Sequence, residues 1–182
     1  MRIVGLSVVK NEDDVIEAMV RHNLAFLDHL HVIDNGSTDR TRSILQALQD
    51  EGLAVSHEVN DALQHIQASI LSDHVNGPYA EDHIVLLDSD EFLICTAMDL
   101  SDLFEQATGP VTIPWVTYVP RPSDPQDDLN PLTRITHRRR REKPAYSKVL
   151  IPACVSRPIE VTSGSHGIKK IKAEPHPVVK LA

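Results

Sequence analysis

Strand and helix patterns alternate through the first half of this chain, and that alternation restricts the fold more than any other feature. Short apolar runs typical of buried strands lie at residues 2–9, 30–33, 53–59 and 83–87. Apolar residues at helical spacing lie between these runs, at residues 11–27, 41–52 and 61–75. This order is typical of βαβ units, so the chain is predicted to form an α/β fold with a mainly parallel central sheet flanked by helices.

The rest of the chain has a different character. We expect a short helix at residues 99–107 and strands at 111–119 and 148–151, while the proline-rich segment 120–131 is expected to be a loop. A chain of 182 residues can bury about 70% of the surface that its unfolded form exposes, and it is too short to expect two domains. We therefore predict a single domain over residues 1–182.

Composition limits the partners and the location. The formal net charge of -8 repels nucleic acid, and an aromatic share of 4% argues against a surface that stacks bases, so no nucleic-acid partner is expected. No stretch approaches 18 apolar residues, which predicts no transmembrane segment, and we expect a cytoplasmic protein. Cys95 and Cys154 lack partners at metal-ligand spacing and are expected to be buried free thiols.

The triplet Asp88-Ser89-Asp90 directly follows the apolar run 83–87. Because side chains alternate along a strand, the carboxylates at 88 and 90 are expected to face the same side where the strand opens into a loop. Two hard anionic oxygens suit Mg²⁺ or Mn²⁺, which keeps open positions for the phosphates of a ligand. The triplet therefore indicates a metal–diphosphate site, and the alternative is an ordinary acidic loop.

Asn11 and Asp34 also lie at the carboxyl ends of predicted strands, as Asp88 does. Ligands of open parallel sheets bind at this edge, near the point where the strand order reverses. The three positions together therefore strengthen the prediction of a ligand site. Asn11 has a second interpretation, as the N-cap of the following helix with Asp14 three residues later.

Four motifs of this sequence resemble those of the family 2-like glycosyltransferases. They are Val9-Lys10-Asn11-Glu12, the segment from Val32 to Asp39, Leu87-Asp88-Ser89-Asp90-Glu91-Phe92 and Gly164-Ser165-His166. The chain looks most like the branch with an Asp-x-Asp-Glu-Phe signature and a late Gly-Ser-His. The resemblance spans residues 3–166 and implies a GT-A fold and an enzyme that moves a sugar from a nucleoside-diphosphate sugar to an acceptor hydroxyl, with a metal ion and with inversion.

The resemblance also implies roles in nucleotide binding. Asp34 matches the family carboxylate that hydrogen-bonds the base, and an acceptor there favours the N–H donors of uracil and guanine, so a UDP- or GDP-sugar is expected. Asn11 and Glu12 match the nucleotide contact after the first strand, and Ser89 and Lys148 are also assigned to the nucleotide-sugar. Lys148 has a second interpretation, as a solvated residue at the edge of the sheet.

The same resemblance implies that Asp88 and Asp90 hold the divalent cation and that His166 supplies a third ligand. The cation would bridge the diphosphate and stabilise the leaving nucleotide as a Lewis acid. An imidazole ligand favours Mn²⁺ over Mg²⁺. The alternative for His166 is a histidine in a surface loop.

Other side chains keep two interpretations. Trp115 either faces the acceptor sugar or packs in the core, whereas His22 is expected to be a partly buried structural residue. The basic run from Arg134 to Lys143, which contains Arg138–Arg141, is either a solvated mobile loop or a flap whose arginines neutralise a diphosphate or an acidic acceptor.

The sequence does not assign the catalytic base. Inverting transfer needs a general base near the acceptor hydroxyl, and the candidates are Glu91, beside the metal ligands, and Asp124, Asp127 and Asp128 in the proline-rich loop. The acceptor, whether glycan, lipid or protein, is also open. Relatives continue beyond the Gly-Ser-His region, so we expect a truncated chain, and the alternative function is a module that binds the donor without transferring sugar.

Other nucleotide-handling classes fit less well. A nucleotidyltransferase would need a Gly-rich phosphate loop near the first strand, but residues 5–12 contain only Gly5. A phosphatase of the Asp-x-Asp type carries its motif after the first strand, whereas here the motif follows the fourth. A dinucleotide-binding oxidoreductase needs Gly-x-Gly-x-x-Gly, which is absent.

Overall fold

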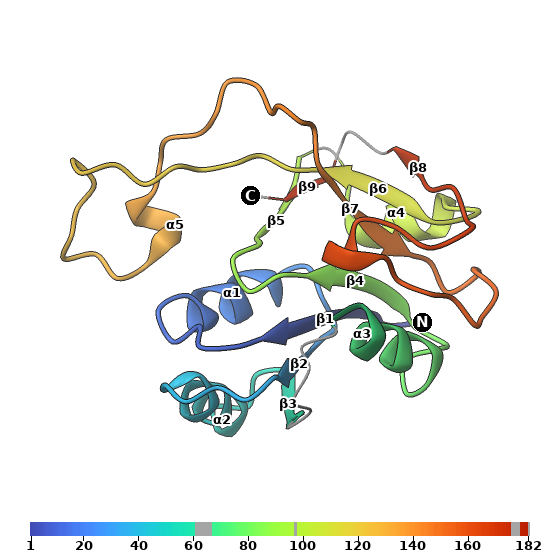
Figure 1. The fold of residues 1–182 in the computed structure, drawn as a ribbon, viewed down its shortest axis with the longest axis horizontal. Helices are drawn as coiled ribbons and strands as arrows, with labels where there is room; N and C mark the ends of the chain where they lie inside the picture. Colours follow the sequence, from blue (N-terminus) through green and yellow to red (C-terminus); the bar gives the residue numbers. More distant parts are fainter. Residues whose placement is uncertain (61–66, 97, 176–178, 182) are drawn as a thin grey trace.

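A seven-stranded sheet forms the centre of the protein (Figure 1). The structure is a computed structural model that describes residues 1–60, 67–96, 98–175 and 179–181. Within them, the strands of this sheet are β1 (Ile3–Val9), β2 (His29–Asp34), β3 (Val55–Val59), β4 (His83–Leu87), β6 (Val111–Pro114), β7 (Ser147–Ile151) and β8 (Glu174–Pro175). Their order is β3-β2-β1-β4-β7-β6-β8, with β1 to β4 parallel and β7 antiparallel to both of its neighbours. The predicted mainly parallel sheet is confirmed.

Helices cover both faces of this sheet. They are α1 (Ile16–Asn23), α2 (Thr41–Asp50), α3 (Gln67–Asn76) and α4 (Leu100–Gln106), whereas the short helix α5 (Pro131–Arg134) lies away from the sheet (Figure 1) and a 3-10 turn, η1, spans Ser163–Ser165. Apolar side chains of α1, α2 and α4 pack on one face, and those of α3 pack on the other. Strand β1 is buried along its whole length, which explains its continuous apolar sequence. No helix in the described part of the chain is long and apolar enough to span a membrane.

A second, two-stranded sheet joins distant parts of the chain. It pairs β5 (Leu93–Cys95) with β9 (Val179–Leu181) in antiparallel register. The carbonyl of Leu181 also accepts a hydrogen bond from the backbone N–H of Val116 at 2.7 Å. The last described strand therefore ties the segment after the acidic triplet to the segment after β6.

The predicted order of strands and helices in the first half is confirmed. The fourth strand has the predicted bounds, and the others agree within a few residues. The helix expected at 61–75 is described from Gln67 to Asn76, and residues 61–66 lie outside the described residues. This agreement follows from burial, because strands covered on both faces by helices must be apolar throughout.

Two smaller expectations are wrong. The strand expected at 111–119 ends at Pro114, because the backbone of Val116 turns to bond Leu181 of β9. Cys154 is exposed rather than buried, since it lies in the turn after β7, and Cys95 is only half-buried.

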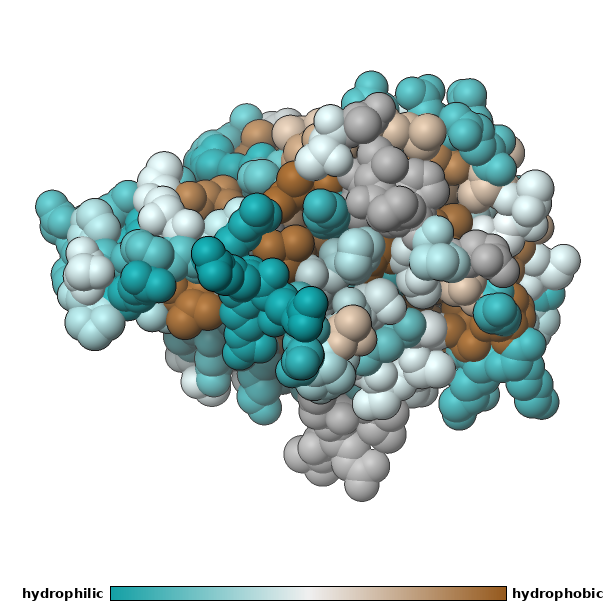
Figure 2. Space-filling view, turned by 90° about the horizontal axis from the view of Figure 1, so that it is seen from above, coloured by the Kyte–Doolittle hydropathy of each residue, from teal (hydrophilic) through white to brown (hydrophobic). Residues whose placement is uncertain are grey.

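Residues 115–147 form an arm that extends beyond the sheet and carries α5 (Figure 1). The two sides of the arm pair through their backbones: Val119 N–H donates to the carbonyl of His137 at 2.7 Å, and Arg139 N–H donates to the carbonyl of Thr117 at 2.9 Å. The basic run is therefore held by its backbone, while the side chains of Arg138–Arg141 are exposed. The space-filling view from above shows hydrophilic residues in teal next to patches of hydrophobic residues in brown (Figure 2).

The tight packing of β1 generates a stability prediction. A Cβ atom added at Gly5 would lie 2.6 Å from Leu30 Cδ1 and 2.7 Å from Leu27 Cδ1, and both leucines are buried. Gly5→Ala should therefore lower the free energy of unfolding by about 1–3 kcal/mol, the usual cost of overpacking. Urea denaturation measures the change. Gly109→Ala is the matched control, because nothing lies within 4 Å of its added Cβ, and equal losses in both variants would contradict the packing explanation.

Candidate functional site

The carboxyl ends of β2, β1 and β4 meet at one edge of the sheet. These strands are neighbours, and the register places the last residue of β1 opposite Asp34. Asn11 and Asp88 lie just beyond the ends of β1 and β4. The predicted meeting of the three positions at a single edge is therefore confirmed.

A cavity of about 740 Å³ lies at this edge, between the sheet and the arm. Five acidic side chains line it, contributed by the segments after β1 and β4: Glu12, Asp14, Asp88, Asp90 and Glu91. The arm contributes aromatic and basic residues, among them Trp115, Tyr118 and Arg134. Because like charges repel strongly in a partly buried cavity, a diphosphate needs a cation to enter the acidic side.

Asn11 is not a helix cap, so that interpretation is wrong. The helix begins at Ile16, and Asn11 has a φ of 58°, a left-handed conformation that asparagine tolerates better than most residues. Its backbone N–H donates to Ser37 Oγ at 2.9 Å, and its side-chain Oδ1 accepts from the backbone N–H of Thr38 at 2.8 Å. Asn11 thus ties the loop after β1 to the turn after β2.

Asp34 is completely buried at the end of β2. Its Oδ1 accepts hydrogen bonds from the backbone N–H groups of Gly36 and Ser37 and from Arg42 Nε at 2.8 Å. Burial raises the pKa of Asp34, but the hydrogen bonds from Ser37 and Arg42 outweigh that effect and hold the pKa below its usual value. The other oxygen, Oδ2, is buried without a protein partner among the described residues. Asp34 therefore shapes its turn and keeps one unused acceptor.

Lys148 is completely buried on β7, so its interpretation as a solvated edge residue is wrong. Its Nζ lies 2.7 Å from Asp88 Oδ2 and 3.4 Å from Glu91 Oε2. The other oxygen of Asp88 accepts a hydrogen bond from Gln67 Nε2 at 2.9 Å. Asp88 is thus held from both sides by protein donors, because a buried ammonium must be paired with a carboxylate.

Asp90 and Glu12 also line the cavity. Asp90 is exposed, and Ser89 is buried beneath it. Burial and the nearby charge of Asp90 raise the pKa of Glu12, while a hydrogen bond with Ser89 opposes this. Of the two aspartates in the triplet, Asp90 is therefore the more accessible to a cation.

His166 is not brought together with the two aspartates. Within the described residues, Asp88, Asp90 and His166 do not form a group whose ligand atoms all lie within 4.8 Å of one another. The ring of His166 stacks on Tyr146 and meets the edge of Trp115, and its Nδ1 bonds the carbonyl of Ser147 at 2.7 Å. A carbonyl only accepts, so Nδ1 carries the proton and Nε2 keeps its lone pair. The assignment of His166 as a ligand stays a prediction.

Of the four candidate bases, Glu91 lines the cavity and the three aspartates of the arm do not. Burial raises the pKa of Glu91 to about 7, although the charge of Lys148 opposes the shift. Its Oε2 accepts the backbone N–H of Asp88, and its Oε1 is buried without a protein partner among the described residues.

The three arm aspartates have positions of their own. Asp124 is buried and accepts the backbone N–H of Arg121, whereas Asp127 is exposed. Asp128 accepts hydrogen bonds from Thr133 and from the backbone N–H of Asn130, which lower its pKa. Asp124 and Asp128 therefore shape the arm.

His22 and Trp115 both line the cavity. His22 is half-buried between the rings of Phe26 and Phe92, and its Nε2 donates to the carbonyl of Leu93 at 2.8 Å, as expected of a structural histidine. Trp115 packs against the core and also faces the cavity. Its two interpretations are therefore compatible.

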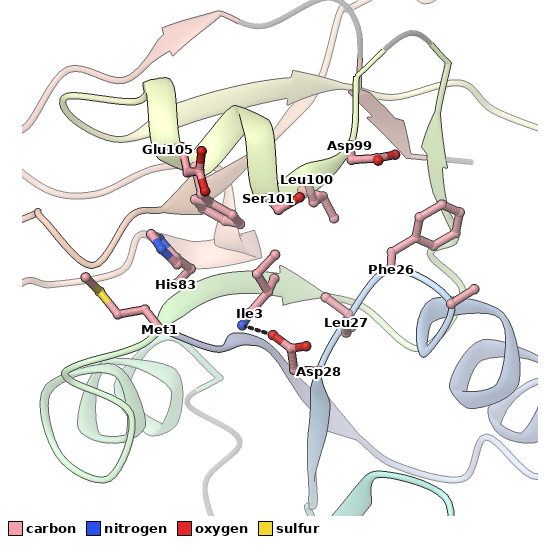
Figure 3. A pocket seen from close by; sticks show the side chains of 12 residues that line it. Met1, Ile3, Phe26, Leu27, Asp28, His83, Asp99, Leu100, Ser101 and Glu105 are labelled. Atoms are coloured by element: carbon pink, nitrogen blue, oxygen red, sulfur yellow. Dashed lines mark hydrogen bonds between the residues drawn. The ribbon is translucent and has the colours of Figure 1, made fainter.

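A second cavity, of about 600 Å³, opens at the opposite edge of the sheet (Figure 3). Met1, Ile3 and His83 line it at the amino ends of β1 and β4, below α4. Asp28, which accepts the backbone N–H of Ile3 at 2.8 Å, also lines it. None of the four motifs reaches this cavity, so the carboxyl edge is the candidate site.

Two contacts of the site were not anticipated from the sequence. Arg42, in the first turn of α2, pairs with Asp34 at the end of β2, and Gln67 holds Asp88 from the first turn of α3. The separation of eight positions between Asp34 and Arg42 offered a weak local signal. Nothing in the sequence pointed to Gln67, because 21 residues separate it from Asp88.

Two solved structures of S. aureus TarS support the observed fold, and a third solved structure aligns less closely. TarS residues 1–349 from S. aureus align with a TM-score of 0.50 and 17% identity, covering 69% of this chain and 39% of that one. Full-length S. aureus TarS aligns with a TM-score of 0.50 and 16% identity, covering 70% and 24%. The mannosyltransferase PcManGT from Pyrobaculum calidifontis, solved with GDP-Man and Mn²⁺, aligns with a TM-score of 0.45 and 22% identity, covering 68% and 36%. The chain thus spans less than two fifths of the length of each of these proteins.

Sequence comparison identifies the family. Comparison with curated proteins found no significant match. The model of the family described as glycosyl transferase family 2 matches residues 6–158, a range that contains three of the four motifs. With this match over most of its length and the GT-A architecture described above, the chain belongs to glycosyl transferase family 2.

Proposed function

We propose that this chain binds a nucleoside-diphosphate sugar with a divalent cation in the acidic cavity and transfers the sugar, with inversion, to an acceptor hydroxyl. The observation that carries the proposal is the meeting of Asn11, Asp34 and Asp88 at one edge of the sheet, beside a cavity that Glu12, Asp88 and Asp90 line. We further propose that residues 1–182 act as a single domain, which the packing of two apolar clusters on opposite faces of one sheet supports.

The side chains of the triplet fit a divalent cation. Asp90 and Asp88 present hard oxygen donors to the cavity, and the surplus of acidic groups there favours a cation over a free diphosphate. Mn²⁺ or Mg²⁺ bound to them supplies Lewis-acid stabilisation of the leaving diphosphate. Lys148 neutralises Asp88 on its buried side, which leaves Asp90 as the principal ligand of the chain.

Asp34 is proposed to select the base through its Oδ2. Among the residues that the structure describes, this oxygen is a buried acceptor without a protein partner, and an uncompensated acceptor of that kind is costly until a donor arrives. The imide N–H of uracil or the N–H groups of guanine supply such a donor. Because the carboxylate is fully buried, a neighbouring side chain has to move for the base to reach it, and we propose that this is Arg42, which bonds Oδ1 and is 40% exposed.

Glu91 is proposed as the general base for the acceptor hydroxyl. It is the candidate that lines the cavity, and a carboxyl pKa raised to about 7 by burial suits proton transfer near neutral pH. Trp115 and Tyr118 give the opposite wall an apolar surface of the kind that packs against a sugar ring.

A donor-binding module without transfer is the second candidate function. The observation that favours it is the anchoring of Glu91, whose Oε2 bonds the backbone of Asp88 and lies near Lys148. Binding and turnover separate the two functions. Metal-dependent binding of UDP or GDP without hydrolysis or transfer of any nucleotide-sugar would leave only the binding module.

The metal prediction is tested most cleanly at Asp90. Asp90→Ala should weaken binding of UDP or GDP in Mn²⁺ at least tenfold, or about 1.4 kcal/mol, because the accessible ligand is lost. Asp88→Ala should act in the same direction but also leaves Lys148 unpaired, so its stability must be measured separately. Calorimetry with Mn²⁺ and with EDTA gives the affinities. Asp127→Ala is the matched control, an exposed aspartate outside the cavity. Equal wild-type affinity in EDTA and Mn²⁺ would exclude the cation.

Asp34→Ala should weaken UDP or GDP by about 1–3 kcal/mol, the cost of losing a buried hydrogen-bond partner, while pyrophosphate binding stays nearly constant. Calorimetry with both ligands measures this. Arg42→Ala is the control, since it removes the ion pair and keeps the carboxylate. If Asp34 serves only the turn, the affinities for nucleotide and pyrophosphate should fall together, and the base contact is then wrong.

His166→Ala should weaken Mn²⁺ binding in the ternary complex at least tenfold and leave Mg²⁺ nearly unaffected, because imidazole prefers Mn²⁺. His137→Ala, a histidine of the arm, is the control. A structure with Mn²⁺ and nucleoside diphosphate gives the direct measurement, with His166 Nε2 expected about 2.0–2.4 Å from the metal, as in known metal–imidazole bonds. An ordered 164–167 loop with the imidazole far from the metal would rule out the third ligand.

A further inference from the structure

Two histidines and a glutamate converge where β2, β3 and α3 meet. His31 lies on β2, Glu58 on the neighbouring strand β3 and His74 on α3. Their ligand atoms all lie within 4.8 Å of one another. Among the described residues, no other three histidine, cysteine, aspartate or glutamate side chains bring their ligand atoms this close together. Three elements that are separate in the sequence therefore bring metal-ligand atoms together.

The distances in this cluster fit a common ligand. His74 Nε2 lies 3.0 Å from Glu58 Oε1, and His31 Nε2 lies 3.7 Å from Glu58 Oε2. Two ligand atoms on a tetrahedral Zn²⁺ stand roughly 3.3 Å apart when the bonds are about 2.0–2.1 Å. The observed separations lie on either side of that value, so small side-chain movements suffice to bind one ion.

The hydrogen bonds of His74 determine which of its nitrogens is free. Its Nδ1 lies 2.8 Å from the carbonyl of Ile70, an acceptor, so Nδ1 carries the proton. In the neutral ring Nε2 then presents a lone pair to the carboxylate of Glu58. Two acceptors at 3.0 Å need either a proton or a metal ion between them, and the arrangement suits both.

Outer contacts hold both rings in place, as they do around metal-binding histidines. His31 is buried, and its Nδ1 lies 2.8 Å from Ser56 Oγ. The ring of Tyr79 packs against both imidazoles, at centroid distances of 5.4 Å from His31 and 6.5 Å from His74. The carboxylate of Glu58 is half-exposed, which leaves room for a water molecule as a fourth ligand.

The cluster is independent of the candidate catalytic site. None of its three residues lines either cavity, and none belongs to the four sequence motifs. Its rings lie on the face of the sheet that α3 covers.

We propose that His31, Glu58 and His74 bind one Zn²⁺ ion. Two imidazole nitrogens and a carboxylate oxygen are ligands of intermediate hardness, and such a set suits Zn²⁺ better than Mg²⁺ or Ca²⁺. The bound ion links the edge strand β3 and helix α3 to β2, so its role is to stabilise that end of the sheet.

Zinc titration calorimetry on the whole chain without nucleotide tests this proposal. Wild type should bind one equivalent of Zn²⁺ and show a rise in the thermal unfolding midpoint. Glu58→Gln and His74→Gln should each weaken Zn²⁺ at least about 100-fold, more than the loss typical of outer contacts. Both side chains are at least partly exposed, so these variants should fold, and circular dichroism checks it. Co²⁺ in place of Zn²⁺ should give the visible absorption of a tetrahedral site in wild type and in neither of these two variants.

Two control variants separate this site from others. His29→Gln removes a neighbouring histidine that bonds Ser56 but lies outside the cluster, and Asp90→Ala removes the proposed nucleotide-site ligand. Both should keep wild-type Zn²⁺ affinity. Loss of binding in Asp90→Ala, equal affinity in Glu58→Gln and wild type, or no binding by wild type would each overturn the proposal. Donor binding is tested separately, by calorimetry with UDP or GDP and Mn²⁺.

Discussion

The candidate site depends on one buried charge, the ammonium of Lys148. Removing an ion from water costs several kcal/mol, and in this position the cost is offset only by close pairing with carboxylates. Asp88 at 2.7 Å and Glu91 at 3.4 Å supply that pairing. Because Lys148 lies on β7 and the two acids follow β4, the ion pairs also fix how the acidic loop sits on the sheet.

These ion pairs give the neighbouring acids of the loop different partners and different exposure. Asp88 is occupied by Lys148 and Gln67, while Asp90 remains exposed to the cavity. Glu91 has a raised pKa because it is buried and Lys148 compensates only part of that cost. Residues of similar chemistry in one short motif therefore have different properties, which their surroundings determine.

The site and the zinc cluster share a structural connection. The described ends of the β3–α3 connection contact two acids of the candidate site: the backbone N–H of Asn60 donates to the backbone carbonyl of Asp34, and Gln67 donates to the side chain of Asp88. Glu58 and His74 lie on the two elements that this connection joins. The elements that position the candidate site are thus the same ones that the proposed metal would hold together.

The sequence by itself determined the order of strands and helices, the family and the edge at which Asn11, Asp34 and Asp88 meet. These features are local, because burial on both faces makes a strand continuously apolar and polar residues mark its carboxyl end. Only the tertiary structure decided that Lys148 is buried and that His31 and His74 converge on Glu58. Lys148 and Asp88 are 60 residues apart, and a charge pair between such distant positions leaves no periodic pattern in the sequence. Whether a lysine is solvated or buried depends on which strand becomes its neighbour, and that is settled only when the sheet forms.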